Sequence, residues 1–167
     1  MAQTFSVWFD RLLLSLAVVA AGLIAMIAVA IIANLILRNL KLPVIYGTLD
    51  AVEYAIMIAT FMGAPWVLNK RAHVQVDLVF ANLSFSNQLL LGRLNALLGA
   101  AICVCFSWFG VEAMLESLNR GSMVRTSFVI PEWWTLVIVP FSMGLCAIEF
   151  TRHSLNTNPS ELTGSEL

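Results

Sequence analysis

Few side chains in this sequence belong to the types that carry out catalysis or bind metals. His73 and Asp77 are four residues apart and would share one helix face, but two ligands make a weak metal site. Three cysteines lie in apolar stretches without the spacing of a metal or redox motif, and we expect them to pack as small apolar side chains: Cys103, Cys105 and Cys146. We therefore expect no catalytic site, no metal and no cofactor.

The acidic residues include two pairs at helical spacing. Asp50 and Glu53 are three residues apart, Glu112 and Glu116 are four apart, and each pair lies near the end of an apolar stretch. A charge in the middle of such a stretch would mark an ion or substrate path, and the sequence has none there. Either membrane-surface placement or contact with a partner subunit explains the pairs, and Arg125 is a further candidate contact.

The segment from Leu12 to Leu37 contains no charged side chain and is long enough to cross a bilayer. The whole chain of 167 residues is 60% hydrophobic and only 11% charged, which indicates a membrane protein. Its net charge of -1 gives no reason to expect nucleic acid as a partner. A cleaved signal peptide is the alternative, since Ala28-Val29-Ala30 resembles a cleavage site, but the apolar stretch is too long for one.

The predicted fold is an all-α integral membrane protein. Backbone groups in lipid must be satisfied within their own segment, so the apolar spans are helices. We expect one domain over residues 1–152, with four transmembrane helices at about 12–37, 49–69, 93–116 and 132–150. Residues 72–83 have the pattern of a short amphipathic helix at the membrane surface, although their alternation would also suit a strand. Residues 153–167 form a polar tail.

Glycine, proline and tryptophan residues mark the ends of the last two spans. Gly121 is a plausible stop for the third helix, and Pro131 suits the first turn of the fourth. Trp133 and Trp134 follow at once and are typical of an anchor at the membrane interface. Pro140 lies inside the fourth span, where we expect it to bend the helix.

Small residues recur every fourth position in the first span, at Ala17, Ala21 and Ala25. Such a stripe allows two helices to approach closely in lipid, so it is a candidate helix contact. Alanine is common in membrane helices, and chance is the alternative explanation.

Several of these residues together resemble a known family. An acidic start to the second span is followed by a small residue, a basic residue and the motif His-Val-x-Val-Asp, which is similar to the small, Q-type membrane subunit of tripartite ATP-independent periplasmic (TRAP) transporters. The residues concerned are Asp50, Glu53, Gly63, Lys70, Arg71, His73, Val74, Val76 and Asp77. Gly121-Ser122, Ile130-Pro131-Glu132-Trp133 and Pro140 also resemble that family. Its members often have adjacent acids where this chain has two acids three residues apart.

The resemblance implies a part in a three-component importer in the bacterial inner membrane. A periplasmic binding protein captures an organic acid, such as a C4-dicarboxylate or a sialic acid, and a large M-type membrane subunit carries it inward on a sodium gradient. The small subunit attaches to the large one and keeps both termini in the cytoplasm. The distribution of basic residues slightly favours the same orientation, because five lie on the side of the termini and four on the other side.

Two other classes of function are alternatives to this one. An independent four-helix channel or exporter would need a polar face shared by several spans, which a homo-oligomer could supply. A membrane oxidoreductase would need ligands such as histidine inside the spans, and both histidines lie outside them. The scaffold subunit of a TRAP transporter explains the sequence better than either.

Overall fold

The computed structural model describes residues 2–43, 46–70, 85–125, 127 and 129–155. Over these residues the chain forms helices and one small hairpin, in the order α1 (Ala2–Asn39), α2 (Thr48–Asn69), α4 (Phe85–Arg120), β1 (Met123–Arg125), β2 (Val129–Pro131), α5 (Glu132–Leu136) and α6 (Ile138–Leu155). Within this described part, four helical segments are long and apolar enough to cross a membrane: Ser6–Asn39, Thr48–Asn69, Leu90–Arg120 and Glu132–Ser154. The structure is therefore that of a four-span α-helical membrane protein.

The helices extend beyond several of the predicted ends. α1 begins ten residues before the predicted start at residue 12, and α4 begins eight residues before residue 93. α6 continues to Leu155, so the first residues assigned to the polar tail are helical. Apolar length alone underestimates these helices, because their polar end turns continue the same backbone hydrogen bonding. The predicted surface helix at 72–83 lies outside the described residues.

Glycine ends α4 as the sequence predicts. Gly121 has a φ of 64°, a left-handed conformation that costs a glycine little. The chain folds back over the helix end, where Gly121 N donates to Leu118 O at 3.2 Å and Ser122 N donates to Ser117 O at 3.2 Å. These bonds direct the chain into the β1–β2 hairpin, whose antiparallel register pairs Val124 with Ile130.

Pro140 interrupts the fourth span. A proline has no backbone N–H, so the carbonyl of Leu136 loses the partner that a continuous helix would give it. The span divides at Val137, between α5 and α6, three residues before the proline. The fourth span is therefore interrupted near Pro140, with the irregular turn N-terminal to the proline, and the expected bend stays a prediction.

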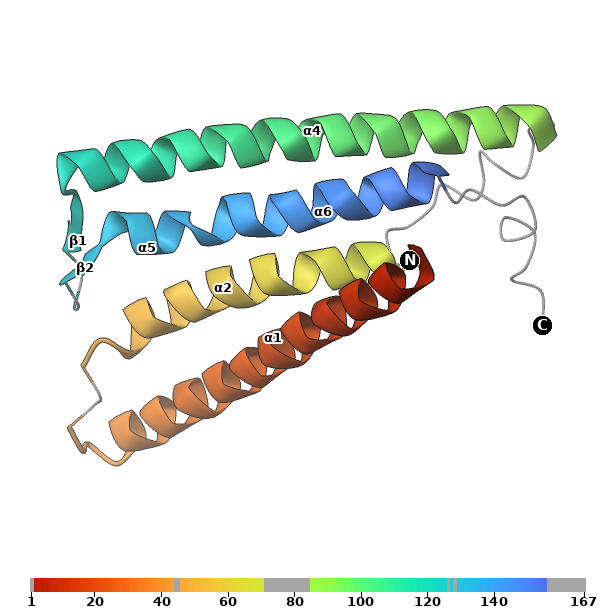
Figure 1. Ribbon diagram of the computed structural model, residues 1–167. Coiled ribbons are helices and arrows are strands. Elements are labelled where there is room, and N and C mark those ends of the chain that lie inside the picture. Colours follow the sequence, from red (N-terminus) through yellow and green to blue (C-terminus); the bar gives the residue numbers. More distant parts are fainter. Residues whose placement is uncertain (1, 44–45, 71–84, 126, 128, 156–167) are drawn as a thin grey trace, which may run out of the picture.

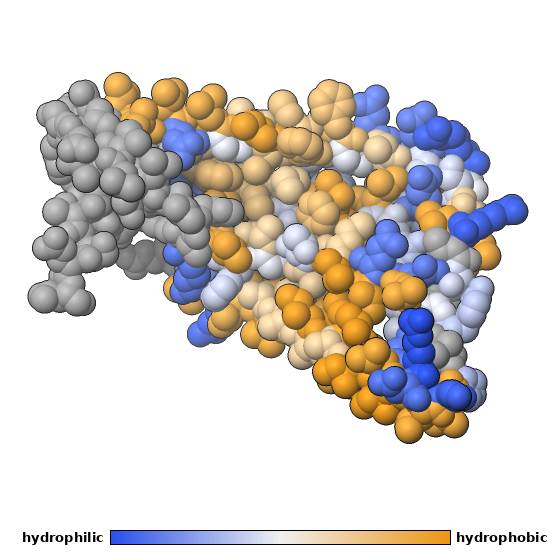
Figure 2. All heavy atoms as spheres, turned by 180° about the vertical axis from the view of Figure 1, so that it is seen from behind, coloured by the Kyte–Doolittle hydropathy of each residue, from blue (hydrophilic) through white to orange (hydrophobic). Residues whose placement is uncertain are grey.

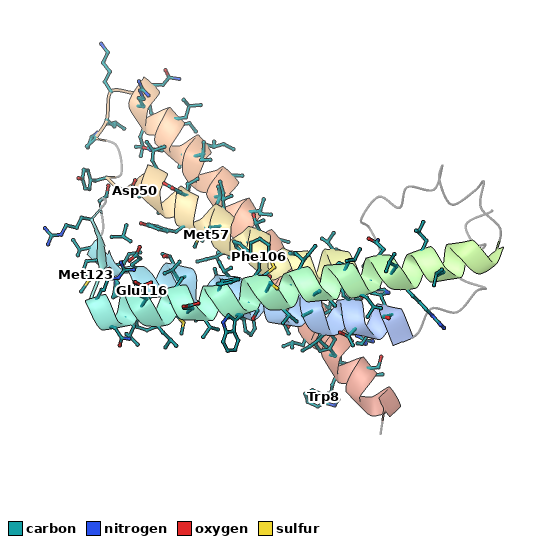
Figure 3. All side chains as sticks on the ribbon, turned by 90° about the horizontal axis from the view of Figure 1, so that it is seen from above. Trp8, Asp50, Met57, Phe106, Glu116 and Met123 are labelled. Atoms are coloured by element: carbon teal, nitrogen blue, oxygen red, sulfur yellow. The ribbon has the colours of Figure 1, made fainter. Side chains whose placement is uncertain are left out.

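The four spans lie in an open row. Figure 1 shows the order α4, α6, α2, α1, with α5 in line with α6, and the same neighbours pack against one another. α1 and α2 lie close together where α1 begins and diverge toward the other end of α1. Seen from above, α1 crosses the direction of α4 and α6 (Figure 3). The row leaves much of each outer helix uncovered by the rest of the described chain.

Small residues of α4 allow α6 to approach closely. The Phe150 ring lies over Gly99, where an added Cβ would come within 2.6 Å of the ring, and the Pro140 ring lies over Gly110 at a corresponding 3.1 Å. Ser107 Oγ donates to the Pro140 carbonyl oxygen at 3.1 Å. Close packing and an interhelical hydrogen bond therefore hold α4 to α6, as expected for helices that meet in lipid.

The surface has the polarity of a membrane protein. Large apolar side chains are exposed along α1 and α4 in particular, among them Val18, Ile24, Leu35, Leu98 and Phe109. On the face shown in Figure 2, apolar side chains cover the middle of the molecule and hydrophilic ones gather toward its ends. This distribution places the middle of the row in the hydrocarbon of a bilayer.

Candidate functional site

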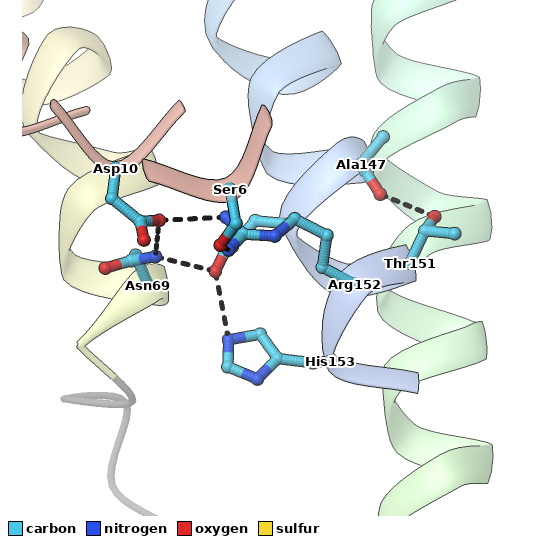
Figure 4. Close-up of polar contacts among 8 residues, drawn as sticks. Ser6, Asp10, Asn69, Ala147, Thr151, Arg152 and His153 are labelled. Carbon is cyan, nitrogen blue, oxygen red and sulfur yellow. Dashed lines mark hydrogen bonds and ion pairs between the residues drawn. The ribbon is translucent and has the colours of Figure 1, made fainter. Parts of the chain in front are cut away.

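A network of polar side chains joins three helices at the end of the row where α1 begins and α6 ends (Figure 4). Arg152 Nη1 of α6 donates to Asp10 Oδ1 of α1 at 3.0 Å and to Glu149 Oε2 at 2.8 Å. Asn69 Nδ2, at the end of α2, donates to Asp10 Oδ1 at 3.1 Å and to Glu149 Oε1 at 2.8 Å. Two donors thus each bridge the same two carboxylates, and the bridges tie α1, α2 and α6 together.

The network surrounds a buried carboxylate. Glu149 is only 3% exposed, which would be costly for a charge without partners. His153 Nε2 lies 3.4 Å from Glu149 Oε1 and forms an ion pair with it when the imidazole is protonated. Arg152 also donates to Ser6 Oγ at 2.7 Å, and its guanidinium group lies 5.2 Å from the centre of the Phe9 ring. These contacts compensate the burial of the Glu149 charge.

A second set of polar contacts lies at the opposite end of the row. Asp50 Oδ2, in the first turn of α2, accepts a hydrogen bond from Ser127 N of the hairpin at 2.7 Å. Ser117 Oγ of α4 donates to Glu132 Oε2 at 2.9 Å, and Glu132 N donates to Ser122 O at 3.1 Å. The Asp50 carboxylate, a candidate partner contact, therefore binds the hairpin of its own chain.

The other charged candidates are exposed around this same end. The structure leaves Glu53, Glu112, Glu116 and Arg125 at the surface. Glu116 lies 3.5 Å from Arg120 in an exposed ion pair one turn along α4. Figure 3 shows Asp50, Glu116 and Met123 at this end of the molecule. Exposed charges of both signs therefore lie toward this end of the row.

The tryptophan pair lies where the hairpin enters the fourth span. Trp133 and Trp134 form an edge-to-face pair with ring centres 5.9 Å apart. Trp133 is half-buried and Trp134 is exposed. Pro131 immediately precedes α5 in an extended conformation, as its N-cap residue.

The alanine stripe of α1 faces largely away from α2. Ala21 and Ala25 are exposed and Ala17 is half-buried. The close contact with α2 is made instead by Ala20, which is 4% exposed and whose Cβ lies 3.8 Å from where a Cβ of Gly63 would be. The neighbouring buried residues of this helix face are Phe9, Leu13 and Ile27. Within this chain the stripe is therefore open at its second and third alanines.

Part of the family motif cannot be placed. Arg71, His73, Val74, Val76 and Asp77 lie outside the described residues. Among the motif positions that are described, Gly121 ends α4 and Pro131 precedes α5.

Sequence reasoning did not find the Asp10–Asn69–Glu149–Arg152 network. The sequence pattern predicts only that the fourth span ends at about residue 150, and it gives Glu149 and Arg152 no role. One signal was available, because an acid near the start of the first span and an acid–base pair near the end of the fourth must lie on the same side of a membrane. The helix order that brings them together appears only in the folded chain.

The fold and these contacts define a multi-pass membrane protein in which three of the four spans, α1, α2 and α6, are tied at one end by a network of charged and polar side chains. The sequence model described as "Tripartite ATP-independent periplasmic transporters, DctQ component" matches residues 27–157, which is most of the chain. Comparison with curated proteins and with solved structures gave no significant match. The chain therefore belongs to the DctQ family and is a small membrane subunit of a TRAP transporter, a transporter component and not a member of an enzyme family.

Proposed function

We propose that this subunit is the stationary scaffold of a sodium-coupled importer of an organic acid. The observation that carries the proposal is the open row of four spans, with apolar side chains exposed along α1 and α4 and polar contacts gathered at its two ends. Such a row enlarges the membrane-embedded part of a complex. Its charged groups are at the ends of the spans, where they do not form a path for a solute across the membrane.

The polar network supports the scaffold role because it makes the row stiff. In this proposal a large subunit moves a substrate-bearing domain across the membrane, and another part of the complex must stay still. Arg152 and Asn69 hold the tilted helix α1 against α2 and α6. The close packing between α4 and α6 holds α4 in the row. The crossing of α1 over the row would resist rotation of the complex in the bilayer.

The hairpin end is the proposed docking side for a periplasmic binding protein. Exposed acids and Arg125 surround it, and the Asp50–Ser127 hydrogen bond fixes the hairpin to α2. Trp133 and Trp134 would set the depth of this end at the outer interface. The opposite end, where α1 begins and α6 ends, would then face the cytoplasm, in the bacterial inner membrane.

The proposed cargo is a carboxylate such as a C4-dicarboxylate or a sialic acid. Its delivery belongs to the binding protein and its transport to the large M-type subunit. In this proposal the specificity for one acid lies in those two partners and not in the small subunit.

Reconstitution into liposomes tests the proposal. Vesicles holding both membrane subunits, with the binding protein outside and an inward sodium gradient, should accumulate the acid, and vesicles holding the small subunit alone should not. Uptake by the small subunit alone would contradict the scaffold role and favour the homo-oligomeric channel or exporter. Full uptake by the large subunit without the small one would also contradict the proposal.

A further inference from the structure

A proline interrupts the backbone hydrogen bonding of α2 near the end where the polar network lies. Pro65 lies inside this helix, four residues before its last residue, Asn69. Proline has no backbone N–H, so the carbonyl of Phe61, four residues earlier, loses the donor that a regular helix would supply. In the hydrocarbon of a bilayer no water can replace that donor. α2 therefore has a carbonyl whose partner must come from elsewhere in the protein.

A serine of the neighbouring helix supplies that partner. Ser142 Oγ of α6 donates to Phe61 O at 2.5 Å. Ser142 is 1% exposed and Pro65 is also fully buried, so the packed helices enclose both the hydroxyl group and the proline ring. The side chain of one helix thus replaces the backbone donor that the other helix lacks.

Two threonines of the spans show the local alternative. Thr60 Oγ1 donates to Ile56 O at 2.8 Å, and Thr151 Oγ1 donates to Ala147 O at 2.8 Å, so each bonds four residues back in its own helix. Ser142 instead bonds across to α2. The difference coincides with an acceptor in α2 that lacks its backbone donor.

The last turn of α2, which follows the proline, makes contacts that depend on its direction. Trp66 packs against a cluster from α1 and α6, and Leu68 packs in a cluster with side chains of α4 and α6. Asn69 Nδ2 donates to carboxylates of α1 and α6 in the polar network. Prolines are common sites of helix kinks, because the missing hydrogen bond loosens the turn before them. The direction of this turn relative to the rest of α2 therefore decides whether Asn69 reaches both carboxylates.

We propose that Ser142 is the latch of a proline hinge in α2 and thereby a positioning residue for the polar network. Its hydroxyl group does the work of the missing N–H of residue 65 and fixes the last turn of α2. Asn69, about 12 Å from Phe61 at helical rise, is then held where it bridges the two carboxylates. The latch belongs to the isolated chain and goes beyond the proposed function, so either can fail without the other.

A double-mutant cycle, measured by thermal unfolding of the full chain in detergent, tests the latch. Ser142→Ala should lower Tm by about 5 °C, because a buried carbonyl loses its donor. With Pro65→Ala, residue 65 regains an N–H for Phe61 O, and adding Ser142→Ala should then lower Tm by less than about 2 °C. Ser107→Ala is the matched control, since the Pro140 carbonyl that Ser107 serves lies within α6 and keeps a backbone donor four residues on. Its effect should be the same with proline or alanine at position 65.

A spectroscopic measurement reports the hydrogen bond itself. Phe61 and Met62 form the single Phe–Met pair of the sequence. Isotope labelling of phenylalanine carbonyl carbons together with methionine nitrogens therefore isolates the Phe61 carbonyl signal in an NMR spectrum. Ser142→Ala should move this signal upfield, as expected for a carbonyl that loses a hydrogen bond, and adding Pro65→Ala should return it toward the parent position.

Asn69→Ala tests the positioning role. It should lower Tm equally in the parent and in the Ser107→Ala variant, and by less in the Ser142→Ala variant, where the last turn of α2 no longer holds Asn69 in place. Equal effects in all three backgrounds, an unmoved Phe61 signal, or an equal loss from Ser142→Ala with and without Pro65 would each overturn the inference. If Ser142→Ala alone does not fold, folding of its double variant with Pro65→Ala supports the latch, and failure of both overturns it.

Discussion

Arg152 uses one guanidinium nitrogen to hold carboxylates from two helices. Its Nη1 lies 3.0 Å from Asp10 Oδ1 and 2.8 Å from Glu149 Oε2. Glu149 is buried whereas Asp10 is about half exposed, so most of the dependence on Arg152 comes from Glu149. In a buried pair, the larger energetic effect is the cost of leaving one charge without its partner.

Replacing Arg152 with alanine should therefore destabilise the chain. Glu149 would keep Asn69 and His153 as partners, and we expect a loss of about 2 kcal/mol, below the full cost of breaking a buried pair. Thermal unfolding of the purified variant in detergent measures this. Arg152→Lys should recover only part of the loss. The lysine ammonium group keeps the positive charge, but it reaches fewer acceptors than the guanidinium group.

Arg11 provides the matched control for this prediction. It follows Asp10 on α1 and is exposed, so Arg11→Ala should change stability by less than about 0.5 kcal/mol. Equal effects of the Arg11 and Arg152 variants would mean that net charge at this end, and not the network, sets stability.

At the scale of elements, the contact between α4 and α6 depends on glycine. A Cβ on Gly99 would come within 2.6 Å of the Phe150 ring. A Cβ on Gly92, which lies about two turns earlier on the same face of α4, would meet nothing within 4 Å. The same substitution at these two sites therefore tests packing separately from helix propensity.

Gly99→Ala should destabilise the chain by about 1–3 kcal/mol, since the Phe150 ring must move out of a close-packed position. Gly92→Ala should instead stabilise the chain by up to about 1 kcal/mol, because it gains the helix propensity of alanine and meets no neighbouring atom. Thermal unfolding in detergent is again the measurement. Adding Phe150→Leu to Gly99→Ala should restore part of the loss, and a loss that this second change leaves untouched would assign the effect to the backbone.

The elements themselves were largely predictable from the sequence. The apolar runs located all four spans because lipid demands continuous helices, and Gly121 and Pro140 marked a stop and an interruption for reasons of backbone geometry. The helix ends were less predictable, because polar residues such as Asp10 and Arg152 continue a helix once another helix supplies their partners. The hairpin at Met123–Pro131 was not predicted, since its strands are only three residues long.

At the scale of the whole molecule, adjacent alanines of α1 have different surroundings. Ala20 is buried against Gly63 of α2, and Ala21 is exposed. The every-fourth-residue pattern favoured the stripe containing Ala21, but the chain uses the face containing Ala20 for its own packing. The stripe remains a proposed contact with a partner subunit.

Leucine at each position should therefore have a different effect. Ala20→Leu should lower the stability of the isolated chain by about 1–3 kcal/mol through overpacking against α2. Ala21→Leu should leave the isolated chain stable and lower recovery of the large subunit if the stripe is an interface. Thermal unfolding and co-purification measured on the same preparations separate the two effects. An Ala21→Leu complex of normal yield would assign the stripe to lipid.

The sequence by itself determined the solvent, the four spans and the family resemblance, because each of these depends on local composition or on short motifs. The tertiary structure decided which charges are paired, which alanine faces another helix and which serine donates to a carbonyl of another helix. These depend on the order and tilt of helices far apart in the chain. No local pattern contains that order, since in lipid an outward and an inward apolar residue look alike.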